Sequence, residues 1–150
     1  MAGVTASPTG NGRFQTRLAL PGGDILADEP VEVGGLGTGP TPYQLLAAAL
    51  AACTSMTLRM YAERKDWALP PFDVAVAHSA SGGRDRFDRH ILFAGPLSPE
   101  QQLRLIEIAD KCPVHRTLVQ GFEVVTTASP VAAGEPPAQH FRDMQAACAE

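Results

Sequence analysis

The clearest hydrophobic pattern in the chain is a long helical segment that begins near residue 41. Thr41 is a suitable N-cap, Pro42 fits the first helical position, and no Gly or Pro follows until Pro70. Residues 45–53 are apolar on every side, whereas charged side chains occupy the last turns. We therefore predict a helix that begins buried and becomes exposed towards its end.

Two groups of short alternating segments, one before and one after this helix, predict hairpins. Residues 13–20 and 24–27, separated by a Pro-Gly-Gly turn, predict the first hairpin. Residues 72–78 and 88–94 predict the second, with a polar turn over residues 79–86 between its strands.

A second helix and a closing strand follow the second hairpin. Ser98–Gln101 combines an N-cap, a proline in the first turn and a capping-box Gln, so a helix begins there, with Leu103 and Ile106 in its periodic apolar pattern. This helix should stop or bend at Cys112–Pro113, because proline has no N–H and crowds the preceding turn. Residues 122–127 predict a short final strand.

The order of strands, long helix, strands, helix and strand predicts an α+β fold in which a mostly antiparallel sheet curves around a central helix. The predicted domain covers residues 13–127. Residues 1–12 form an N-terminal extension and residues 128–150 a C-terminal tail. A wrapping loop is expected over residues 28–40, which contain two prolines and four glycines.

Composition narrows the classes of function. The 150 residues include 12 basic and 16 acidic side chains, giving a net charge of −4 with no long run of one sign, so nucleic acid is not an expected partner. The first residues do not resemble a signal peptide, and the apolar run over residues 45–53 is too short to cross a bilayer. We expect a cytoplasmic protein without a membrane partner.

The three cysteines are the candidate chemical groups, because an odd number fits thiol chemistry or burial better than a disulfide framework. Cys53 shares a helix face with apolar or small residues, so burial should raise its pKa, and reactivity would require a cation from elsewhere. Cys112 lies close to Lys111, His115 and Arg116. The residues alone leave both a reactive and a packing role open for each of these two thiols.

Cys148, near the end of the chain, is expected to be incidental. Cys112 and His115 supply only two metal ligands, and no second pair stands nearby in the sequence. We therefore expect neither a metal site nor a cofactor.

Two segments resemble the OsmC/Ohr family, and in particular its cytoplasmic OsmC-like branch. They are residues 39–57, which contain Ala-Ala-Cys-Thr-Ser-Met-Thr, and residues 109–118, which contain Asp-Lys-Cys-Pro-Val-His-Arg. Both occur in the right order, and the resemblance covers about residues 13–127. It implies an OsmC-like fold and an intertwined homodimer, in which each long helix is buried and the active sites lie at the subunit interface.

The resemblance also implies a thiol-dependent peroxidase that reduces organic hydroperoxides under oxidative stress. Cys53 would be the peroxidatic cysteine and Cys112 the resolving one. Attack on the peroxide gives a sulfenic acid, which the second thiol converts to a disulfide. An external dithiol or a lipoylated protein would then restore the pair.

This chain departs from the family pattern at the groups that activate the thiol. The peroxidases of the family place an Arg beside the reactive cysteine and a Glu early in the long helix, which orients that Arg. Here no acid follows Pro42 until Glu63. Glu29 and Glu32 are the alternatives for the orienting acid.

The activating cation has two alternative sources. Arg13 or Arg17 on the first hairpin is one, and His115 or Arg116 beside Cys112 is the other, in which case the roles of the two thiols are reversed. A second hypothesis is a non-catalytic or ligand-binding dimer of the same fold, whose cysteines are structural.

Overall fold

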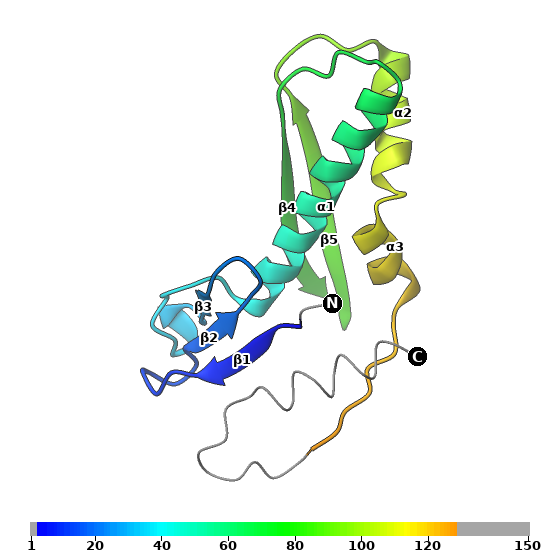
Figure 1. Cartoon of the computed structure of the whole chain (residues 1–150). Coiled ribbons are helices and arrows are strands. Elements are labelled where there is room, and N and C mark those ends of the chain that lie inside the picture. Colours follow the sequence, from blue (N-terminus) through cyan, green and yellow to red (C-terminus); the bar gives the residue numbers. More distant parts are fainter. Residues whose placement is uncertain (1–2, 129–150) are drawn as a thin grey trace. The chain divides into compact units, whose positions relative to one another are not determined.

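The structure, a computed structural model, describes residues 3–128, which fall into two compact units (Figure 1). The N-terminal unit reaches Pro42 and also takes in the described residues from Val125 onwards. The helical unit runs from Tyr43 to Val124. Cys148 and the predicted tail beyond Ala128 lie outside the described residues.

The N-terminal unit contains a three-stranded antiparallel sheet in the order β1-β2-β3. Strands β2 (Thr16–Ala19) and β3 (Ile25–Ala27) confirm the first predicted hairpin. Strand β1 (Thr5–Pro8) lies in the expected N-terminal extension and pairs with β2. The sequence analysis did not predict β1, because its small and polar residues carry no alternating apolar signal.

The loop after β3, which includes the 3₁₀ helix η1 (Val31–Val33), folds around the carboxylate of Asp28. Asp28 is 2% exposed and accepts hydrogen bonds from the N–H groups of Glu29 (2.8 Å), Leu36 (3.2 Å) and Thr38 (3.2 Å) and from the Thr38 hydroxyl (2.7 Å). The Thr38 hydroxyl is the main reason why the pKa of Asp28 lies below its ordinary value, although burial acts in the opposite direction. This carboxylate fixes the path of the predicted wrapping loop.

The long predicted helix is confirmed as α1 (Pro42–Arg64), but its burial differs from the prediction. One stripe of residues is buried along the whole length of α1, rather than its first half. Because the stripe repeats every three or four residues, it is one helix face packed against the rest of the unit. By length and composition α1 could cross a membrane, with a mean hydropathy of 1.4, but core helices of soluble proteins have the same property. The buried residues are Ala47, Leu50, Thr54, Leu58 and Ala62.

The second predicted hairpin is confirmed as strands β4 (Phe72–Ser81) and β5 (Arg84–Phe93). The predicted eight-residue turn is wrong, because the strands continue as far as the pair Ser81↔Arg84. Gly82 and Gly83 alone connect them, with φ angles of 59° and 75°. Positive φ at both central positions is typical of a type I′ turn, whose twist matches that of the strands.

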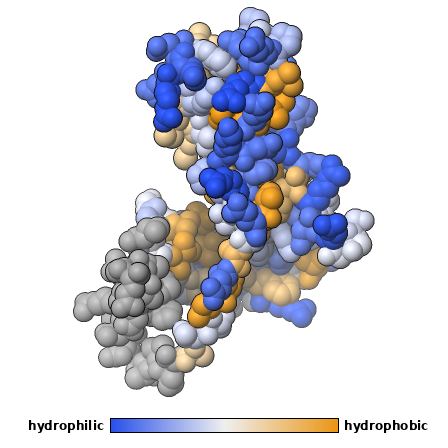
Figure 2. Space-filling model, turned by 90° about the vertical axis from the view of Figure 1, so that its right-hand side faces the viewer, coloured by the Kyte–Doolittle hydropathy of each residue, from blue (hydrophilic) through white to orange (hydrophobic). Residues whose placement is uncertain are grey.

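Helix α2 (Pro99–Ala109) begins at the predicted capping box, in which Ser98 and Gln101 bond each other's backbone N–H groups. Its buried face carries Leu105, Ile108 and Ala109, which pack with Leu58 of α1 to form the core of the helical unit. The predicted apolar residues Leu103 and Ile106 are instead 65% and 53% exposed. From the side of α2 and α3, apolar side chains reach the surface among hydrophilic ones (Figure 2). Apolar residues occur on more than one side of α2, so periodicity alone did not identify the inner face.

Helix α2 ends before Cys112, as predicted, and an unpredicted helix α3 (Pro113–Gln120) begins there. Cys112 is the N-cap of α3 and Pro113 occupies its first position, where a missing N–H is harmless. The strand predicted over residues 122–127 is wrong: described residues 121–128 are exposed and form no strand. The apolar residues of this segment lack a neighbouring strand within residues 3–128, and strand formation requires one.

Candidate thiol site

Cys53 and Cys112, which are 59 positions apart in sequence, meet within the helical unit. Cys53 lies in the middle of α1 and Cys112 lies at the start of α3, and their side chains share a hydrogen bond. Cys112 is fully buried, whereas Cys53 is half-buried. The structure therefore brings the two predicted thiols together, and the more accessible one belongs to α1.

The environment of Cys53 opposes its ionisation. Burial is the main reason why the pKa of Cys53 is raised, and both the hydrogen bond to Cys112 and the charge of that thiolate raise it further. The backbone N–H of Val114 and the hydroxyl of Thr57 act in the opposite direction without reversing the shift. Cys53 thus holds its proton when the neighbouring sulfur is ionised.

The environment of Cys112 favours its ionisation. Burial is the largest single influence and acts to raise the pKa of Cys112, but the surrounding hydrogen-bond donors together lower it below its ordinary value. When the pair of thiols loses its first proton, the negative charge is therefore favoured on the Cys112 sulfur, and the Cys53 thiol donates a hydrogen bond to that sulfur. The donors are the Cys53 thiol, the N–H of His115, the Thr54 hydroxyl and the N–H of Val114.

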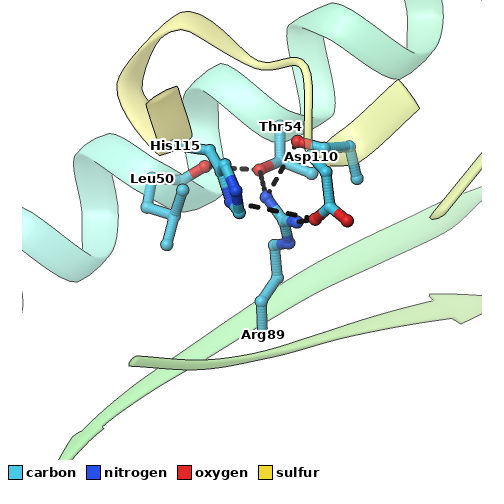
Figure 3. A network of polar contacts seen from close by, with 6 residues as sticks. Leu50, Thr54, Arg89, Asp110 and His115 are labelled. Atoms are coloured by element: carbon cyan, nitrogen blue, oxygen red, sulfur yellow. Dashed lines mark hydrogen bonds and ion pairs between the residues drawn. The ribbon is translucent and has the colours of Figure 1, made fainter. Parts of the chain in front are cut away.

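A largely buried cation that the sequence analysis did not identify, Arg89, contacts Thr54, the residue after Cys53 in α1 (Figure 3). The guanidinium of Arg89 donates to the Thr54 hydroxyl (3.0 Å) and to the carbonyl of Ala109 (3.1 Å). It also forms an ion pair with Asp110 at 2.7 Å, and the Arg89 side chain is only 12% exposed. Three elements, α1, β5 and the end of α2, are thereby joined around one positive charge.

A signal for Arg89 was present in the sequence. Strand β5 alternates between exposed and inward positions, and Arg89 shares the inward face with Phe87, Ile91 and Phe93. A charged residue on the apolar face of an alternating strand is unusual, because burial of a charge requires a partner. The pattern indicated a buried cation, but the sequence gave no means of naming its partners.

The cations predicted beside Cys112 take other positions. His115 contributes its backbone N–H to the Cys112 sulfur, while its ring nitrogen Nδ1 lies 3.8 Å from Asp110. Arg116 is exposed, and its N–H donates to the Cys112 carbonyl as part of the first turn of α3. The helix start, rather than these two side chains, provides the donors from α3.

The remaining predicted site residues belong to the N-terminal unit, and their roles stay predictions. Arg13 is exposed and lies over the ring of Phe14, 5.0 Å from its centroid. Arg17 forms an exposed ion pair with Asp24 at 3.2 Å. Glu29 is half-buried, and Glu32 is exposed in η1.

A cavity of about 500 Å³ flanks the Arg89 network within the helical unit. Neither cysteine is among its lining residues. Within residues 3–128, no three His, Cys, Asp or Glu side chains are grouped so that they could hold a metal ion. The cavity is lined by Leu50, Phe87, Arg89, His90, Ile91, Phe93, Gln102, Ile106, Ala109, Asp110 and His115.

Comparison with known proteins agrees with this architecture. Residues 35–127 match the family model described as OsmC-like protein. An uncharacterized protein of Acinetobacter baylyi is 27% identical over 115 residues, which cover 70% of this chain and 80% of the relative.

Solved structures of similar proteins share the fold. The OsmC-like protein of Mycoplasma pneumoniae superposes with a TM-score of 0.68 at 22% identity, over 79% of this chain and 87% of the other. An organic hydroperoxide resistance protein of Legionella pneumophila superposes with a TM-score of 0.61 at 21% identity, over 79% of this chain and 88% of the other. The organic hydroperoxide resistance protein OhrB of Bacillus subtilis superposes with a TM-score of 0.55 at 22% identity, over 78% of this chain and 89% of the other.

The fold and the matched family model together define the class: an α+β protein with antiparallel sheets and a long helix, of the type seen in organic hydroperoxide resistance proteins. The chain belongs to the OsmC-like family.

Proposed function

We propose that the protein is a thiol-dependent peroxidase that reduces organic hydroperoxides through a dithiol–disulfide cycle between Cys53 and Cys112. The observation that carries this proposal is the hydrogen-bonded contact between the two thiols, in which ionisation of Cys112 is favoured. A peroxidase needs a thiolate as nucleophile and a second thiol close enough to form the disulfide. The contact places the second thiol next to Cys53, and the ionised Cys112 sulfur is the base that can take the proton of Cys53.

In the proposed cycle the Cys112 sulfur accepts the proton of Cys53, and the Cys53 thiolate attacks the distal oxygen of the hydroperoxide. The O–O bond breaks, Cys53 becomes a sulfenic acid, and the departing alkoxide takes a proton from Cys112 to leave as an alcohol. The Cys112 thiolate then attacks the Cys53 sulfur, forms the disulfide and releases hydroxide, which becomes water. An external dithiol or a lipoylated protein reduces the disulfide and is itself oxidised.

The surroundings of Cys53 support an organic rather than an inorganic peroxide. Along α1 its neighbours one turn away in either direction include Leu50 and Met56, and the half-buried Cys53 is the accessible member of the pair. Related proteins named organic hydroperoxide resistance proteins share this fold. An apolar substrate tail fits such surroundings better than hydrogen peroxide does.

A homodimer is part of the proposal, with the cytoplasm as its location. Within residues 3–128 the unburied side of α1 carries large apolar side chains, Leu46 (41% exposed), Met56 (62%) and Met60 (62%). Large exposed apolar surface on a helix is typical of a surface that another chain covers. A second copy of the chain would bury it.

One observation favours the alternative of a non-catalytic module. Cys112 is completely buried (0% exposed), as a cysteine with only a packing role would be. Brief treatment with peroxide, followed by mass spectrometry, separates the two functions. A Cys53–Cys112 disulfide is expected for the peroxidase, whereas two unmodified thiols would support the module.

Serine variants test the roles of the thiols directly. Cys53→Ser should lower the consumption of cumene hydroperoxide with a dithiol reductant by about a hundredfold or more, because the nucleophile is lost. Cys112→Ser removes both the base and the resolving thiol, so a sulfenic acid should form at Cys53 more slowly than in the wild type but persist, and a dimedone reagent should trap it. Cys148→Ser is the matched control and should keep the wild-type rate.

Two results would change this assignment. Wild-type turnover by Cys53→Ser would remove Cys53 from the cycle. A sulfenic acid trapped at Cys112 in the Cys53→Ser protein, together with retained turnover, would reverse the roles of the two thiols.

A further inference from the structure

The Thr54 hydroxyl has two hydrogen-bond acceptors within reach but only one proton to donate. In the structure it donates to the carbonyl of Leu50 at 2.7 Å, a bond between residues four apart in α1. The same hydroxyl also lies in hydrogen-bond contact with the Cys112 sulfur. Because a hydroxyl rotates freely, its proton can turn from the Leu50 carbonyl to the sulfur when Cys112 loses its own proton.

Arg89 decides how well this hydroxyl can serve as a donor. Its guanidinium donates to the Thr54 oxygen at 3.0 Å and thereby occupies a lone pair of that oxygen. An oxygen that accepts from a cation becomes a stronger donor through its own O–H, because the two hydrogen bonds polarise each other. The low exposure of Arg89, 12%, keeps water from screening this effect.

The Arg89 guanidinium is held in place from two further directions. Asp110, after the last turn of α2, pairs with it at 2.7 Å, and the carbonyl of Ala109 accepts a hydrogen bond at 3.1 Å. The planar guanidinium therefore has three separate partners, and its orientation towards Thr54 is fixed.

We infer that Arg89 is a positioning residue of the thiol pair: its buried guanidinium holds and polarises the Thr54 hydroxyl, which donates to the ionised sulfur of Cys112. The importance of this relay for turnover rests on the proposed peroxidase function. The relay itself concerns the ionisation of a thiol and exists with or without a peroxide substrate.

The ionisable groups around the relay come from all the packed elements. Cys53 faces the Cys112 sulfur from α1, and Asp110 faces Arg89 from the end of α2. The ring nitrogen Nδ1 of His115, from α3, lies 3.8 Å from the Asp110 carboxylate. His115→Gln therefore measures separately what this contact contributes to the titration.

The test is a pH titration of the reduced protein by the ultraviolet absorbance of thiolate, in a Cys148→Ser background so that only the pair is observed. Thr54→Val keeps the shape of the side chain but removes the hydroxyl, and it should raise the apparent pKa of the first ionisation by about one unit. Thr54→Ser should restore the wild-type value. Arg89→Met should raise the pKa by at least as much, with Arg89→Lys between Met and wild type.

Arg86→Met is the matched control for the arginine variants. Arg86 lies on the same strand, but its ion pair with Asp88 is exposed, so its loss should leave the titration unchanged. If Arg89→Met does not fold, the comparison of Thr54→Val with Thr54→Ser carries the test. An unchanged apparent pKa in Thr54→Val would overturn the relay.

Peroxide turnover, measured separately, distinguishes this inference from the proposed function. A raised pKa in Thr54→Val, in a protein that consumes no peroxide, would support the relay and overturn the peroxidase. Wild-type turnover and an unshifted pKa in the same variant would overturn the relay and leave the peroxidase standing.

Discussion

Two buried polar networks in this protein differ in whether the hydrogen-bond donors around the ionised group can themselves ionise. In the N-terminal unit the carboxylate of Asp28 accepts four hydrogen bonds, all from backbone N–H groups and a hydroxyl that stay neutral. In the helical unit the Cys112 sulfur is hydrogen-bonded to the Cys53 thiol, a group that can itself ionise. The first arrangement fixes a loop, whereas the second leaves a proton that can move between sulfurs. A buried network supports chemistry when one of its partners can change its charge.

Of the substitutions that test this comparison, Gly35→Ala in the Asp28 loop should cause the largest loss of stability. A Cβ at Gly35 would lie 1.8 Å from the backbone oxygen of Glu29, so the main chain itself must move. We expect a loss of about 3–4 kcal/mol in the free energy of unfolding. Chemical denaturation measures it, with Gly10→Ala for comparison: a Cβ there meets nothing within 4 Å, so only the positive φ of 81° should cost stability, about 1–2 kcal/mol. Equal midpoints for the two variants would show that the close approach is not required.

Arg89→Met should have the next largest effect on stability. It leaves the carbonyl of Ala109 without this donor and removes the link between α1, β5 and the end of α2. We expect a loss of about 2–3 kcal/mol, less than for a fully buried ion pair because Asp110 is 57% exposed. The exposed Arg86→Met should cost less than about 0.5 kcal/mol in the same denaturation experiment. Similar losses in both would mean that burial does not distinguish the two arginines.

Acid should weaken the Asp28 network by a smaller amount. Because the folded-state pKa of Asp28 is lowered, its contribution to stability is complete above the unfolded pKa of about 4 and is lost as the pH falls through the folded value. Asp28→Asn should remove this part of the acid sensitivity. The difference between the denaturation midpoints of wild type and Asp28→Asn, measured from pH 7 down to about pH 3, isolates it. A constant difference over this range would contradict the assignment.

The smallest effect is expected for Arg17→Ala. The ion pair of Arg17 with Asp24 is exposed, with both side chains about half accessible, so its loss should change stability by less than about 0.5 kcal/mol. The same variant tests the predicted role of Arg17 beside a thiol. A raised thiol pKa, seen in the ultraviolet titration, would give Arg17 that role, whereas an unchanged titration would remove it.

Much of the local structure could be predicted because its causes are local. Thr41 and Pro42 indicated the start of α1, the absence of Gly or Pro up to Pro70 allowed its length, and Ser98 and Gln101 indicated the start of α2. The turn of the second hairpin was predicted too long, although Gly82 and Gly83 carried the signal of a tight turn. The strand expected over residues 122–127 failed because strand propensity has no effect without a neighbouring strand.

Only part of the candidate site could be predicted from the sequence. Cys53 and Cys112 were identified from their motifs, and the structure places them in contact. The activating cation was predicted next to Cys112 or on the first hairpin, and those roles stay predictions. Arg89, which comes from the middle of a different strand and contacts Thr54, was not identified. The sequence showed an arginine on an apolar strand face without showing which helices cover that face.

The sequence by itself determined α1, α2 and the two hairpins, the resemblance to the family, and which two thiols to compare, since capping residues, alternating patterns and cysteine motifs act over short distances. Only the tertiary structure decided which face of α2 is buried, that Arg89 contacts Thr54 of α1, and that the pKa of Cys112 is lowered while that of Cys53 is raised. The physical reason is that burial and hydrogen bonding from other elements set the charge of a side chain. Those elements meet it only when the chain has folded.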